Sequence, residues 1–103
     1  MTKWVKVCKT NELNDGQLLS FDYDDSKIML AKVQGKIFAT DRTCTHEEAD
    51  LSMGILSEQG VTCPLHFSVF NLENGNPENL PAEKPLETFN IKTNENEIYV
   101  EVP

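Results

Sequence analysis

Residues 27–40, with the sequence KIMLAKV-QG-KIFAT, predict a β-hairpin. Two runs rich in β-branched, aliphatic and aromatic residues, 27–33 and 36–40, flank the pair Gln34-Gly35. A two-residue connection with glycine is typical of the tight turns that join antiparallel strands, because glycine readily adopts a positive φ. The stretch therefore favours an antiparallel β fold over a helical bundle.

The sequence on either side of this hairpin continues the strand pattern. Residues 88–93 and 97–102 predict a second hairpin, and residues 4–9 and 17–23 predict outer strands. The sequence Asp24-Asp25-Ser26 is typical of a turn. Inward positions are expected where apolar residues alternate, as period-two patterning requires: Phe89, Ile91, Ile98, Val100 and Val102. We expect the aromatic residues at strand positions to pack in the core or along its edges: Trp4, Phe38, Phe89 and Tyr99.

Between the two hairpins the composition changes. Residues 42–70 contain both histidines and two of the three cysteines, and Gly54 and Gly60 allow tight backbone paths. We interpret this segment as a metal-binding subdomain inserted into a single domain that spans residues 1–103. Residues 71–85, rich in asparagine, glycine and proline, predict an irregular connection.

Length and charge limit the classes of function. The chain has 103 residues, about one domain, and its formal charge of −8 argues against nucleic acid or anionic membranes as partners. A partner with a basic docking face fits this charge better. No apolar run approaches the roughly 20 residues needed to span a bilayer, so we expect a cytoplasmic protein. Three cysteines, an odd number, favour a reducing compartment and metal chemistry over paired disulfides.

The chemistry-bearing motif is Cys44-Thr45-His46, then sixteen residues, then Cys63-Pro64-Leu65-His66. Two thiolates and two imidazoles suit either a tetrahedral Zn²⁺ ion or a [2Fe–2S] cluster with cysteines on one iron and histidines on the other. Zinc fingers usually group like ligands, whereas each loop here supplies one of each kind. Ligand identity alone leaves both metal centres open.

This motif, with Phe67 after the second histidine, resembles the C-x-H…C-x-x-H motif of Rieske iron–sulfur proteins. The resemblance runs from about residue 27 to 102 and is closest to ferredoxin components of bacterial aromatic-ring dioxygenase systems and to archaeal Rieske-type ferredoxins. It implies an all-β fold, an antiparallel β-sandwich with an inserted small cluster-binding subdomain. It also implies one [2Fe–2S] cluster per chain, with Cys44 and Cys63 on the inner iron and His46 and His66 on the outer iron. Pro81 is expected in a loop that covers the cluster.

The chain departs from the pattern of respiratory Rieske subunits. Ala49 and Leu65 stand where those proteins have a disulfide, and the third cysteine, Cys8, is expected to be a buried free thiol. Ser68 matches a serine that hydrogen-bonds the cluster, but Phe70 replaces a tyrosine that does the same. Losing a donor to cluster sulfur disfavours the reduced state, so we expect a potential in the lower part of the roughly −150 to +300 mV Rieske range.

These residues favour an electron carrier over an oxygenase. Rieske oxygenases need a second iron, and the two histidines of this chain are both assigned to the cluster. We therefore expect a soluble one-electron carrier that is not itself an enzyme and that passes electrons from a reductase to a terminal oxygenase. Two alternatives are a small redox subunit of a larger enzyme, such as assimilatory nitrite reductase, and a structural zinc-binding interaction module.

Two surface features near the motif have two interpretations each. Glu47, Glu48 and Asp50 either form an acidic docking rim or belong to a solvated loop. Leu65 and Phe67 either form an apolar contact patch around His66 or pack inward against the second loop.

Overall fold

The computed structural model describes residues 2–45, 49–58, 60–65, 67–80 and 82–103. Within these residues the fold is almost entirely strand, as predicted. The elements in chain order are β1 (Lys3–Lys9), the 3₁₀ helix η1 (Thr10–Glu12), β2 (Leu18–Tyr23), β3 (Ser26–Val33), β4 (Lys36–Asp41), the 3₁₀ helix η2 (Leu51–Met53), β5 (Ile55–Ser57), β6 (Gly60–Thr62), β7 (Val69–Phe70), β8 (Thr88–Phe89), β9 (Ile91–Asn94) and β10 (Glu97–Val102).

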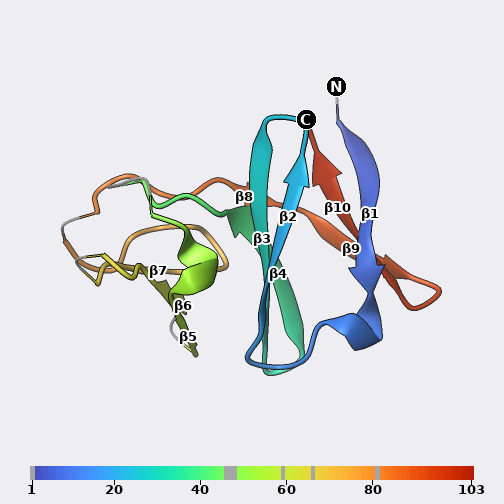
Figure 1. Cartoon of the computed structure of the whole chain (residues 1–103), viewed down its shortest axis with the longest axis horizontal. Helices are drawn as coiled ribbons and strands as arrows, with labels where there is room; N and C mark the ends of the chain where they lie inside the picture. The colour runs from blue at the N-terminus through green and yellow to red at the C-terminus, as the bar shows by residue number, and fades with distance from the viewer. Residues whose placement is uncertain (1, 46–48, 59, 66, 81) are drawn as a thin grey trace.

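The strands form three antiparallel sheets, with the orders β1-β10-β9, β2-β3-β4-β8 and β5-β6-β7. Figure 1 shows the sheet of β2, β3 and β4 in the middle, with β1, β9 and β10 on one side and β5 to β7 on the other. The all-β fold class is confirmed, and the middle sheet is the layer that the other two share.

Strand β3 explains how one sheet supports two cores. Ile28 and Leu30 belong to the core shared with β10, whereas Met29 and Ala31 belong to the core shared with β6 and β7, and all four are fully buried. Successive strand residues point to opposite faces, so a continuous apolar run is the pattern of a strand covered on both sides. The hairpin of residues 27–40 is therefore the centre of the molecule.

The C-terminal hairpin differs from the prediction at one point. Ile98, Val100 and Val102 are fully buried, as predicted, but the strand predicted over residues 88–93 is interrupted at Asn90. Phe89 pairs with β4 of the middle sheet, while Ile91 pairs with β10 of the other sheet. The chain changes sheets at Asn90, and an alternating apolar pattern cannot reveal such a change because both sides of the break face the same core.

The predicted turn at residues 24–26 and the predicted irregular connection at residues 71–85 agree with the structure, apart from one residue of the turn. The turn between β2 and β3 is formed by Asp24 and Asp25, and Ser26 already belongs to β3. In the described part of residues 71–85 there is no strand or helix, as predicted.

Gly54 and Gly60 lie where the backbone passes close to a neighbouring strand. A Cβ atom at Gly54 would overlap the Thr62 carbonyl, and one at Gly60 would overlap the Phe70 carbonyl. Gly60 also has a φ of +145°, which residues with a Cβ atom rarely adopt. The prediction of tight backbone paths is confirmed at both positions.

Gly60→Ala is expected to destabilise the protein by about 3 kcal/mol or more, because backbone strain adds to the overlap with Phe70. Gly35→Ala is the matched control: its φ is +82°, but a Cβ atom there meets no described atom within 4 Å. Strain alone should lower the free energy of unfolding of this variant by about 1 kcal/mol. Urea unfolding followed by circular dichroism measures both, and equal losses would contradict the overlap at Gly60.

Candidate metal centre

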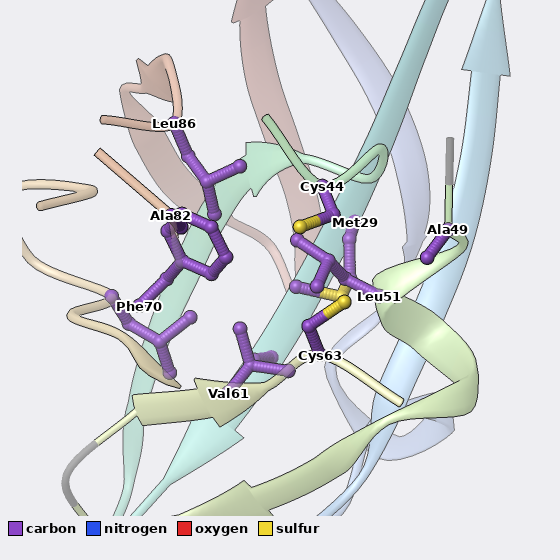
Figure 2. Packing of buried hydrophobic residues seen from close by; sticks show 11 residues of the cluster. Met29, Cys44, Ala49, Leu51, Val61, Cys63, Phe70, Ala82 and Leu86 are labelled. Atoms are coloured by element: carbon purple, nitrogen blue, oxygen red, sulfur yellow. The ribbon is translucent and has the colours of Figure 1, made fainter. Parts of the chain in front are cut away.

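Cys44 and Cys63 come from distant parts of the sequence but lie in one buried cluster. Cys44 is 4% exposed and Cys63 is 0% exposed. The cluster also contains Leu51, Val61 and Phe70. Figure 2 shows the two cysteines on either side of the Leu51 side chain. Two buried cysteines in one apolar cluster are candidate thiolate ligands for a metal.

Each cysteine begins a six-residue loop at the tip of a hairpin. We call residues 44–49 loop 1 and residues 63–68 loop 2. The Cys44 N–H donates to the Ala49 carbonyl at 2.9 Å, and the Cys63 N–H donates to the Ser68 carbonyl at 2.8 Å. The two loops thus share one closure, from the first backbone N–H to the last carbonyl. In sequence, each loop contains one histidine, His46 or His66.

The segment after β7 lies against both loops, and we call residues 71–87 the connecting segment. Its Lys84 carbonyl accepts the Thr45 hydroxyl of loop 1 at 2.7 Å, and its Ala82 N–H donates to the Ser68 hydroxyl of loop 2 at 3.0 Å. Pro81 lies outside the described residues, but Ala82 beside it is buried in the same apolar cluster as the two cysteines. The connecting segment therefore joins the two loops.

Asn79 provides a second attachment of the connecting segment, at the end of loop 2. Its side-chain oxygen accepts the Val69 N–H at 2.7 Å, and its side-chain nitrogen donates to the Phe67 carbonyl at 3.3 Å. Phe67 has a φ of +62°, an uncommon conformation for a bulky residue. Asn79 thus helps to hold loop 2 in a backbone conformation that it would otherwise seldom adopt.

The base of loop 1 carries the charged groups of the site. Arg42, nearly buried, lies 2.6 Å from Asp22 and 3.7 Å from Asp50. Partial burial alone would raise the pKa of Asp50, but hydrogen bonds from Ser52 and the charges of Arg42 and Lys27 outweigh it, so the pKa lies below its usual value. Asp50 is therefore an ionised, engaged group at the base of loop 1.

The remaining predicted residues have several outcomes. His46 and His66 lie outside the described residues, as do Glu47 and Glu48. Within the described part, no three His, Cys, Asp or Glu side chains gather closely enough to hold a metal ion, which leaves the four-ligand set as a prediction. Cys8 is free but only half-buried, on β1.

Of the positions compared with respiratory Rieske subunits, three are buried and pack within the protein: Phe70, Ala49 and Ser68. Phe70 is fully buried in the cluster with the cysteines, and Ala49 is 5% exposed. Ser68 is buried, and its oxygen accepts the Ala82 N–H. Leu65 and Phe67 are exposed, which agrees with the contact-patch interpretation and not with inward packing.

The family of this fold follows from a match to a known domain. The Rieske [2Fe-2S] domain family matches residues 3–90. The chain belongs to the Rieske [2Fe–2S] family. This family explains the two cysteine loops and the three-sheet architecture, and its cofactor is a [2Fe–2S] cluster. The buried pair of cysteines fits that cofactor, because thiolates are the cysteine ligands of iron–sulfur clusters.

Relatives of this Rieske domain cover nearly its whole length. The ferredoxin component of biphenyl 2,3-dioxygenase from Rhodococcus jostii is 35% identical over 98 residues, which are 95% of this chain and 92% of the relative. A solved complex of reduced oxygenase and oxidized ferredoxin in carbazole 1,9a-dioxygenase contains a chain with 33% identity and a TM-score of 0.90, with 94% of this chain and 91% of that chain covered.

A further solved structure shares the fold alone. The nitrite reductase small subunit from Mycobacterium tuberculosis has 21% identity and a TM-score of 0.87, and the match covers 100% of this chain and 97% of that chain. Among the described residues, no helix is long and apolar enough to cross a membrane.

Sequence reasoning missed the contacts that hold the two loops. Asn79, Thr45 and Arg42 are polar residues in irregular segments, and no periodic pattern marks them. The Asn-rich composition of the connecting segment was the one available signal, since asparagine side chains readily bond nearby backbone groups.

Asn79→Ala is expected to loosen loop 2, because two backbone groups lose their side-chain partner. The expected loss is about 1–2 kcal/mol in the free energy of unfolding, with faster loss of cluster absorbance in the presence of an iron chelator. Asn76→Ala is the control, since its side chain is exposed and bonds no described residue. Equal behaviour of the two variants would show that Asn79 does not hold the loop.

Proposed function

We propose that Cys44, His46, Cys63 and His66 bind one [2Fe–2S] cluster per chain, with the two cysteines on the inner iron. Residues 42–70 would form the cluster-binding subdomain of a single domain that spans residues 1–103. The main support is the pair of buried cysteines that begin two matching hairpin loops, each with one histidine in its sequence. When bound, such a cluster supplies a one-electron couple.

The chain's own residues supply what a carrier needs around that couple. The apolar cluster around Cys44 and Cys63 excludes water from the thiolate side of the site. The connecting segment is hydrogen-bonded to both loops. These contacts would limit the reorganisation of the protein on electron transfer. With both histidines assigned to the cluster, this chain has none left for a second iron site. We therefore propose electron transfer and no catalysis on substrate.

We propose that the acceptor is a terminal oxygenase, as the names of the relatives suggest, and that the donor is a reductase. The biphenyl dioxygenase relative is a ferredoxin component, and the carbazole dioxygenase relative lies in a complex with its oxygenase. The nitrite reductase small subunit shares only the fold, so it leaves the alternative of a larger enzyme's redox subunit without specific support. An odd number of cysteines favours a reducing compartment, and we therefore also propose a cytoplasmic location.

The partner's docking face is proposed to be basic around an apolar centre. Residues 42–87 carry eight acidic and two basic residues, a net charge of −6, whereas the other 57 residues carry nine acidic and seven basic, a net charge of −2. Leu65, Phe67 and Leu80 are 47%, 67% and 70% exposed in loop 2 and the connecting segment. Exposed apolar side chains in an acidic part of the chain suit a partner of opposite charge.

The charge asymmetry predicts that salt slows electron transfer to the oxygenase. With the oxygenase component of carbazole 1,9a-dioxygenase as acceptor, we expect the second-order rate constant to fall about tenfold from low to physiological ionic strength. Glu83→Lys, in the connecting segment, should lower the low-salt rate constant severalfold. Glu95→Lys, in the turn between β9 and β10 at the far end of Figure 1, should change it little. A rate constant independent of salt in stopped-flow measurements would contradict this docking surface.

The proposed ligand set predicts opposite behaviour for two cysteines of the same chain. Cys63→Ser should lose the cluster, whereas Cys8→Ser should retain about two iron atoms and two acid-labile sulfides per chain, because Cys8 lies on β1 outside the buried cluster. Iron and sulfide analysis with an electron paramagnetic resonance spectrum of the reduced protein measures both. Stoichiometric zinc in the unmodified protein, or full iron content in Cys63→Ser, would overturn the proposal.

A further inference from the structure

Five polar side chains form a series of contacts that begins and ends on β2 and passes through the base of loop 1. Arg42 lies 2.6 Å from Asp22 and 3.7 Å from Asp50, and the Ser52 hydroxyl donates to Asp50 at 2.6 Å. The Ser20 hydroxyl, on β2, donates to the Ser52 oxygen at 3.0 Å. We call these five residues the clasp.

The clasp joins segments that are far apart in the sequence. Ser20 and Asp22 are alternate residues of β2 and therefore lie on one face of that strand. Leu18, two positions earlier on the same face, packs against the core that contains Cys44 and Cys63. This face of β2 is thus directed toward the candidate metal centre, and its two polar side chains reach the residues on either side of loop 1.

Arg42 is the member that the surroundings constrain most. Its side chain is 11% exposed, compared with 64% for Asp22 and 47% for Asp50. A nearly buried guanidinium requires paired charges, so the contacts of Arg42 are more consequential than those of an exposed ion pair. Its backbone is also engaged at both ends: the N–H donates to the Lys27 carbonyl at 2.9 Å, and the carbonyl accepts the Leu51 N–H at 2.7 Å.

The base of loop 1 has less strand pairing than the base of loop 2, so side-chain contacts are more important for loop 1. Loop 2 continues directly from the paired strands β6 and β7, whereas the base of loop 1 is the isolated bridge between Thr43 and Asp50. Among the described residues, the contact of loop 1 with the connecting segment is the hydrogen bond from Thr45 to Lys84. Side chains at the base of loop 1 therefore have to supply the fixation that a strand ladder supplies to loop 2.

We propose that the clasp is the positioning device of loop 1: it fixes the segment that begins at Cys44 to the middle sheet through Arg42 and Ser52. The proposal rests on the proposed function, because the importance of loop 1 comes from its assigned ligands. Asp22 and Ser20 lie on β2 and act on the loop only through Arg42 and Ser52, so they are positioning residues.

Hydrogen exchange tests the clasp without relying on electron transfer. Asp22→Asn should speed exchange about three- to tenfold in peptides that contain Cys44 and Leu51, whose N–H groups close loop 1 and its base, and should leave peptides of loop 2 unchanged. Ser20→Ala, which alters no charge, should have the same local effect at about two- to threefold. Both variants should also release iron faster to a chelator and shift the reduction potential.

Two matched controls separate positioning from charge and from general stability. Asp25→Asn removes the same charge from an exposed turn, and Ser26→Ala removes a hydroxyl that bonds no described residue. Exchange in loop 1 that is as fast in these controls, or acceleration of both loops together, would overturn the clasp. Loss of iron from the unmodified chain would instead count against the ligand assignment, which the exchange pattern does not measure.

Discussion

Burial of two cysteines in one apolar core is the constraint on which the rest of the structure depends. Cys44 and Cys63 lie 19 positions apart in the sequence and are brought together by two hairpin loops with the same closing hydrogen bond. Neither thiol forms a disulfide, and almost none of either residue is exposed. The backbone around them must therefore be fixed by contacts other than a covalent bridge, and each sheet contributes to that fixation.

The middle sheet packs into both cores and so links the outer sheet to the candidate metal centre. Because β3 is buried on both faces, Ile28 and Leu30 anchor it to one core while Met29 and Ala31 support the core of the cysteines. Polar contacts complete the attachment, with Asn79 and Ser68 at loop 2 and the clasp at loop 1. Respiratory Rieske subunits resemble one another in having a disulfide between the two loops. This chain has Ala49 and Leu65 at those positions, so it relies on these non-covalent contacts.

Much of this arrangement follows from patterns in the sequence, and the rest depends on contacts that no pattern records. The hairpin of residues 27–40 and the alternating residues Ile98, Val100 and Val102 were predictable because period-two patterning reflects burial directly. The short strands β5 to β7 were not predicted, since strands of two or three residues carry too little periodicity. The break at Asn90 and the contacts of Arg42 arise from tertiary pairing. Of the candidate site, the cysteines could be placed in one core, while His46 and His66 stay predictions.

The most direct test of the account is a spectroelectrochemical titration of the purified chain. A Rieske cluster held by Cys44, His46, Cys63 and His66, without a tyrosine at Phe70, should accept about one electron per chain. Its midpoint should lie in the lower part of the roughly −150 to +300 mV Rieske range. A chain that takes up no electron, or that titrates near the upper end of this range, would contradict the account.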